Sequence, residues 1–231
     1  MPPKAIHPTA DPSQTLSTAN PDLRKTVTVG DAEMAYIDIG EGDPIVFMHG
    51  NPTSSFLWRD VIPHVEGMGR VIAPDFIAHG WSSTSPRDAY HFQDNIEYFD
   101  AFFEALGLDE NLILVLHDWG AAVGFERAAR VPEQIQGIAY MEAMVWPRHW
   151  SDIPEDRVGA FKRFRTPEGE AEAIEKNLFV EVMLFERGII RDLSDAEKEV
   201  YRYPTNRSGG TKLPGVIMPN DIPFDGEPAE S

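Results

Sequence analysis

One apolar stretch in the middle of the chain constrains the fold more than any other segment. Residues Leu112–Leu116 form a short, continuous apolar run rich in β-formers, which is typical of a buried parallel strand. Asp118 interrupts the run, and a segment with helical spacing and many small residues follows at once. Asp118 is therefore predicted to lie at a sharp turn from strand to helix. In open α/β sheets this is the carboxyl end of a strand, where ligands bind.

The position of Asp118 has two interpretations. A nucleophile at such an elbow is stabilised as an anion by the helix N-terminus, and the backbone N–H of the next residue, Trp119, faces the pocket. An ordinary helix cap is the alternative, because Asp is among the best N-cap residues. The other motifs of the chain bear on this choice.

Composition narrows the class of partner. The chain has 231 residues, a formal net charge of −18 and no cysteine. The charge disfavours nucleic acid and anionic membranes. The lack of cysteine excludes disulfides and thiolate sites and fits a reducing compartment, so we expect a cytoplasmic protein. No apolar run is long enough to cross a membrane, the N-terminus lacks the apolar core of a signal peptide, and no metal or nucleotide-phosphate spacing occurs.

The order of apolar and polar segments predicts an α/β protein. Strands and helices alternate between Ile45 and Met141, which indicates a mostly parallel sheet with helices on both faces. The later segments have helical patterns and no clear buried strand. We therefore predict four regions: an N-terminal arm (1–22), an α/β core (23–147), a helical cap (148–225) and the start of a return to the core (226–231).

The expected elements follow from the local patterns. Strands are predicted at 25–29, 33–39, 45–48, 70–74, 112–116 and 136–141, and helices at about 54–64, 92–106, 119–130, 158–164, 168–184 and 194–203. In the second strand, Met34, Tyr36 and Asp38 form a mixed face that we expect to be partly solvated. Residues 204–225 are rich in Pro and Gly, and no helix is predicted there.

Four motifs occur in a specific order. They are His49-Gly50-Asn51-Pro52, Asp75 to Gly80, His117-Asp118-Trp119-Gly120, and Glu142 after a strand. Together they resemble the haloalkane dehalogenases, α/β-hydrolase enzymes that cleave carbon–halogen bonds with water and no cofactor. The resemblance covers about residues 25–227. The combination is specific, whereas the His-Asp-Trp-Gly motif alone also occurs in epoxide hydrolases of this fold.

The resemblance implies a role for each residue. Asp118 would be the nucleophile, displacing halide from a small haloalkane and forming an alkyl ester on its carboxylate. Asn51 and Trp119 would hold the halide through side-chain N–H groups and form the oxyanion hole through backbone N–H groups. Glu142 would orient the catalytic histidine, and no metal is implied. The pocket wall is assigned to Trp146, Phe179 and Leu184.

Each role has a simpler structural alternative. Trp119 is also explained as a core aromatic residue, Asn51 as a turn residue before proline, and Glu142 as a solvated strand end. For any one residue, the structural explanation is as good as the functional one. The occurrence of all four motifs in the family's order favours the functional roles.

The chain departs from the family where the general base is expected. In this family the base is a histidine near the C-terminus, but no histidine follows His149. His79 and His149 lie in loops near the expected pocket mouth, and neither is at the family's position. We therefore expect a C-terminally truncated chain that lacks the last strands and helices, hydrolyses the ester poorly, and exposes the strand 136–141 as an open edge for self-association.

Two further residues differ from the family's pattern, and two other functions are possible. Ala78 stands where the family often has glycine, and Leu116 is larger than the small residue usual two positions before the nucleophile.

An epoxide hydrolase would use Tyr201 and Tyr203 as proton donors, although Asn51 argues against it because epoxide hydrolases usually carry an aromatic residue there. A non-catalytic fragment, or a chain that needs a partner segment, is the third possibility.

Overall fold

A mixed six-stranded sheet forms the centre of the protein. The computed structural model describes residues 24–143 and 148–227. The predicted arm (1–22), the predicted pocket residue Trp146 and residues 228–231 lie outside the described residues. The strands are β1 (Arg24–Val29), β2 (Ala32–Ile39), β3 (Pro44–Met48), β4 (Arg70–Pro74), β5 (Leu112–His117) and β6 (Ile135–Met141), in the order β1-β2-β4-β3-β5-β6.

The pairing confirms the predicted α/β fold. Strands β4, β3, β5 and β6 are parallel to one another, while β2 pairs antiparallel with both β1 and β4. Residues alternate between the two faces along each strand, so Val46 and Met48 face one apolar cluster while Ile45 and Phe47 face the other. The sheet is thus covered on both sides.

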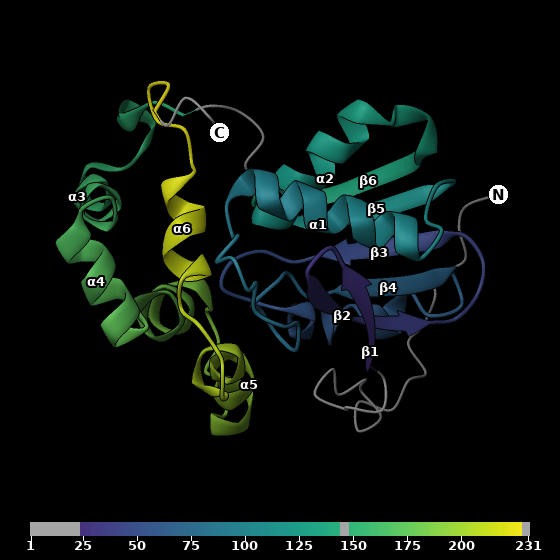
Figure 1. Cartoon of the computed structure of the whole chain (residues 1–231), viewed down its shortest axis with the longest axis horizontal. Coiled ribbons are helices and arrows are strands. Elements are labelled where there is room, and N and C mark those ends of the chain that lie inside the picture. Colours follow the sequence, from purple (N-terminus) through teal and green to yellow (C-terminus); the bar gives the residue numbers. More distant parts are fainter. Residues whose placement is uncertain (1–23, 144–147, 228–231) are drawn as a thin grey trace.

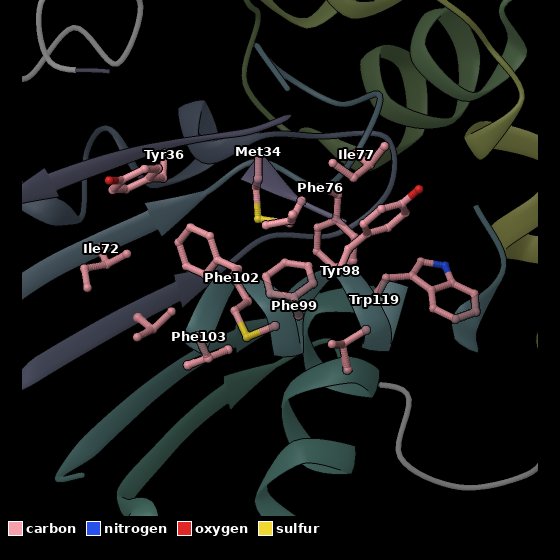
Figure 2. Close-up of a cluster of buried hydrophobic side chains, with 14 of the residues drawn as sticks. Met34, Tyr36, Ile72, Phe76, Ile77, Tyr98, Phe99, Phe102, Phe103 and Trp119 are labelled. Atoms are coloured by element: carbon pink, nitrogen blue, oxygen red, sulfur yellow. The ribbon is translucent and has the colours of Figure 1, made fainter. Parts of the chain in front are cut away.

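Two helices cover one face of the sheet. Helix α1 (Phe92–Ala105) contributes three phenylalanines to the main apolar cluster, and α2 (Trp119–Arg130) packs beside it (Figure 1). Figure 2 shows the α1 rings Phe99, Phe102 and Phe103 among side chains of β2 and β4. On the other face, the predicted helix at 54–64 is instead two 3₁₀ turns, Ser55–Trp58 and Ile62–His64.

The prediction of a partly solvated face on β2 was wrong. Met34 is fully buried and Tyr36 is 9% exposed. The ring of Tyr36 packs edge-on against Phe102 of α1, with centroids 5.4 Å apart, so this face belongs to the main core. Asp38, at the end of the strand, pairs with Arg70 and Lys25 at 2.8 Å each.

The segment after β6 is helical and gathers on one side of the sheet (Figure 1). It contains α3 (Glu155–Phe164), α4 (Pro167–Lys176), a wider π-helical segment (Phe179–Gly188), α5 (Asp195–Asn206) and α6 (Pro214–Asn220). The helix predicted over 168–184 is broken because Asn177 takes a left-handed conformation, with φ 51°. Helix α6 was not predicted. Pro214 lies in its first turn, where proline is tolerated.

Polar contacts attach this helical segment to the core. Arg59, after the first 3₁₀ turn, donates to Glu197 of α5 at 2.9 Å. The carboxylate of Asp221, just after α6, accepts the backbone N–H of Phe92 at 2.7 Å and lies 2.9 Å from the ring of His91. No helix in the described ranges has the length and apolar character to cross a membrane.

The large residue Leu116 is accommodated by a glycine on α2. A Cβ atom at Gly124 would lie 2.4 Å from Cδ2 of Leu116, so the leucine fills the space that a side chain on the helix would occupy. This explains how β5 carries a leucine two positions before Asp118 while α2 still packs closely on the strand.

We expect Gly124→Ala to lower the free energy of unfolding by about 1–3 kcal/mol, the usual cost of overpacking a core. Leu116→Val alone should cost about 1 kcal/mol through lost packing. Because Val removes the clashing atoms, the double variant should be more stable than the sum of the single effects. Urea unfolding of the four proteins measures this, and strictly additive effects would contradict the contact.

Candidate active site

Asp118 occupies a strained elbow between β5 and α2. Its backbone has φ 53° and ψ −120°, a region that costs a non-glycine residue about 1–3 kcal/mol. The side chain makes no capping hydrogen bond to α2. Instead, its Oδ1 accepts the backbone N–H of Asn51 at 2.9 Å. The carboxylate therefore faces the loop after β3, and the interpretation of Asp118 as an ordinary helix cap does not describe this geometry.

Two glycines allow the elbow to approach β3 closely. A Cβ atom at Gly50 would lie 2.1 Å from Oδ1 of Asp118, and one at Gly120 would lie 2.3 Å from the carbonyl oxygen of Met48. Neither position has room for a side chain. The backbone N–H groups at the start of α2 and after β3 are thereby brought to the same carboxylate.

Burial raises the pKa of Asp118 above its ordinary value, and the negative charge of Glu142 acts in the same direction. The backbone N–H groups of Trp119 and Asn51 and the neighbouring His117 act in the opposite direction. The backbone donors around the Asp118 carboxylate thus offset only part of the desolvation of its charged form.

Glu142 follows β6 at the same end of the sheet. The register pairs His117 with Met141, so Asp118 and Glu142 come directly after neighbouring positions on adjacent strands. Glu142 is exposed and, like Asp118, has a positive φ of 50°. The structure therefore brings the predicted acid to the strand end beside the predicted nucleophile.

Trp119 and Asn51 flank Asp118. Trp119 is 5% exposed and lies at one end of the α1 cluster in Figure 2, with its ring 6.1 Å from that of Phe92. Asn51 is half-buried, and its Oδ1 lies 3.2 Å from Nε2 of His79. This contact with His79 was not predicted, because it joins two loops that follow different strands.

A narrow cavity of about 20 Å³ lies between the core loops and the helical segment, room for roughly one water molecule. On the core side it is lined by Asn51, Pro52, Ala78 and His79. The helical segment contributes Phe179, as predicted for the pocket wall, and also Asn177, Val180 and Tyr201. Leu184 packs with Phe56, Val180 and Tyr201 in an apolar cluster.

The histidines of the strand-end motifs support loops. Nδ1 of His49 donates to the Gly50 carbonyl at 2.8 Å, and its Nε2 accepts the N–H of Phe76 at 3.0 Å. Burial lowers the pKa of His49 to about 3, so the ring is neutral. The ring of His117 lies edge-on to Trp58, with centroids 6.3 Å apart.

The two loop histidines considered as bases differ in environment. The side chain of His149 is 71% exposed and lies 2.6 Å from Asp225, which raises its pKa. His79 is 5% exposed, and burial lowers its pKa to about 3, far below the range suited to a general base near neutral pH. Among the residues that the structure describes, no group of three or more His, Asp or Glu could hold a metal ion.

Comparison with known proteins identifies the family. Residues 43–175 match the model of the alpha/beta hydrolase fold family. A haloalkane dehalogenase of Sphingobium indicum is 45% identical over 210 residues, which are 90% of this chain and 71% of the relative.

This chain belongs to the haloalkane dehalogenase family.

Other members of the family agree. A haloalkane dehalogenase of Mesorhizobium japonicum is 40% identical over 96% of this chain and 71% of its own length. A crystal structure of a haloalkane dehalogenase from Bradyrhizobium elkani matches with a TM-score of 0.83 and 38% identity, covering 90% of this chain and 72% of that one. The resemblance in the four motifs is thus matched by identity and fold over most of the chain.

We expect Asp118→Asn to raise the free energy of unfolding at pH 7 by about 1–3 kcal/mol, because it removes an incompletely compensated buried charge while keeping an acceptor for Asn51. The sign follows from the raised pKa, since a raised carboxyl pKa destabilises the fold above that pKa. The gain should shrink as the pH falls from the folded pKa towards the unfolded value. Chemical unfolding at several pH values tests this.

Asp109→Asn is the matched control, because Asp109 is exposed and its replacement should change stability little at any pH. A gain for Asp118→Asn that is the same at low and neutral pH would contradict the assignment of the effect to the buried charge.

Proposed function

We propose that this chain is a hydrolase of haloalkane dehalogenase type, with Asp118 as its nucleophile. The observation that supports this most is the partly buried carboxylate of Asp118 at a strained backbone position, held by the N–H of Asn51 instead of capping α2. Membership of the family supplies the reaction class.

The first step forms a covalent ester. An oxygen of Asp118 attacks the carbon that carries the halogen, a carbon–oxygen bond forms as the carbon–halogen bond breaks, and the halide leaves with the bonding electrons. The indole N–H of Trp119 and the side-chain amide of Asn51 would stabilise the departing anion. The step requires no proton transfer.

The second step requires a base. Water would attack the ester carbonyl of Asp118, and the backbone N–H groups of Asn51 and Trp119 would hold the oxyanion. Glu142 would orient the histidine that activates this water. Within residues 24–143 and 148–227, no hydrogen bond joins a histidine to Asp118 or Glu142. For the 231-residue chain we therefore propose that ester formation is much faster than hydrolysis.

The division into a core (23–147) and a cap (148–225) is part of this proposal. The cavity is lined by residues from both regions, as expected if the cap closes over the carboxyl end of the sheet. A small haloalkane is the substrate class that membership of the family suggests. The epoxide hydrolase alternative would require hydroxyl groups of Tyr201 and Tyr203 in the cavity; Tyr201 lines it, whereas Tyr203 stacks on Trp81.

We expect the 231-residue chain to gain the mass of one butyl group when it is incubated with 1-bromobutane. One equivalent of bromide should be released in a burst. Intact-mass spectrometry and peptide mapping to Asp118 measure this. Asp118→Asn should gain nothing. A folded wild-type protein without an adduct would refute the proposed nucleophile, and continuous bromide release would refute slow hydrolysis.

Self-association through β6 is the proposed partner interaction. Strand β6 pairs on one side with β5 and is the last strand in the described sheet, and Tyr140 and Met141 on it are 61% and 44% exposed. An exposed strand edge with apolar side chains is a template for pairing with a second copy.

Sedimentation velocity should show a concentration-dependent dimer that Met141→Lys weakens, because a charge on the edge opposes pairing. Met68→Lys is the control, since Met68 is 63% exposed but lies just before β4. Equal effects of the two substitutions would argue against the β6 edge as the interface.

A further inference from the structure

His79 is a buried polar side chain that the proposed chemistry does not use. It lies in the loop after β4 and is 5% exposed. Its ring packs on His49 and Phe76, with centroids 5.6 and 6.0 Å away. These contacts fix the plane of the ring, so its two nitrogens point in defined directions.

Both nitrogens of His79 face oxygen atoms. Nδ1 lies 3.1 Å from the carbonyl oxygen of Ile77, and Nε2 lies 3.2 Å from Oδ1 of Asn51. A backbone carbonyl can only accept a hydrogen bond. Burial lowers the pKa of His79 to about 3, so the ring carries a single N–H at neutral pH and can donate to one of the two oxygens.

The location of that hydrogen determines which end of the Asn51 amide faces the pocket. A hydrogen on Nε2 donates to Oδ1 of Asn51 and leaves both side-chain N–H groups free. A hydrogen on Nδ1 donates to Ile77, leaves Nε2 as an acceptor, and requires the amide of Asn51 to turn round. The amide oxygen would then face the pocket and repel an anion.

Within the described residues, the other hydrogen bond of Asn51 is made by its backbone. Its main-chain N–H donates to Asp118 at 2.9 Å, which sets the position of the residue but leaves the end of the side chain free to rotate. His79 supplies the contact that the side chain needs to present donors to a ligand.

We propose that His79 is a positioning residue for halide binding: its Nε2–H holds the amide oxygen of Asn51, so that the amide N–H groups face the halide. The inference rests on the proposed function, because it assigns the cavity side of Asn51 to a halide ion. It adds a residue whose proposed effect on halide binding is exerted through Asn51.

A matched pair of variants separates the two contacts of the ring. In His79→Gln, the side-chain nitrogen can take the position of Nε2 and still donate to Asn51. In His79→Asn, the nitrogen takes the position of Nδ1 and can reach only Ile77. Both variants keep a polar amide, so they differ mainly in the contact with Asn51.

The test is bromide binding to the full 231-residue chain, measured by calorimetry at constant ionic strength. His79→Asn should bind bromide about tenfold more weakly, the loss expected for one hydrogen bond, and His79→Gln should stay within about threefold of wild type. Thermal unfolding of both variants serves as the folding control. Equal weakening by both variants, or by neither, would overturn the proposal.

A second measurement needs no variant. Long-range ¹H–¹⁵N spectra of the wild-type protein distinguish a protonated from an unprotonated ring nitrogen. In bromide-saturated protein, Nε2 of His79 should carry the hydrogen. A hydrogen on Nδ1 under those conditions would overturn the proposal. If the wild-type chain forms an adduct on Asp118 but carries the hydrogen on Nδ1 of His79, only this inference is refuted. If the chain neither forms the adduct nor binds bromide, the proposed function is refuted as well.

Discussion

The close approach of α2 to the end of β3 is the constraint on which the rest of the site depends. It is possible because Gly120 and Gly50 have no side chains, at two points where a single Cβ atom would meet a carbonyl or a carboxylate oxygen. The approach places a helix N-terminus and a loop N–H around one carboxylate, and it holds Asp118 in a backbone conformation that the residue would not adopt alone. Backbone strain and carboxylate position have the same cause.

The electrostatics of the site follow from this packing. A partly buried carboxylate in this position loses hydration, and the two N–H groups directed at it return only part of that energy. The protein thus maintains a costly anion at the position proposed for the nucleophile, and a cost in stability of this kind is usual at catalytic positions. The neighbouring histidines are affected by the same burial: His49 and His79 are neutral rings whose hydrogen bonds shape the loops after β3 and β4.

Much of the core was predictable because its signals are local. The apolar runs at β3, β4 and β5 and the carboxylate between β5 and α2 can be recognised in a few consecutive residues, and the proximity of Asn51 to Asp118 followed from the family resemblance. The errors have non-local causes. Tyr36 is buried by a helix distant in sequence, and α6 is obscured by its prolines. The hydrogen bond between His79 and Asn51 depends on two loops whose paths no local pattern determines.

The contact between Leu116 and Gly124 limits how this sequence can change over evolutionary time. A lineage that first replaces the leucine by a smaller residue frees the facing position on α2 to acquire a side chain. The reverse order passes through an intermediate in which two side chains occupy one space. The two positions therefore permit substitution in one order, with the leucine changing before the glycine.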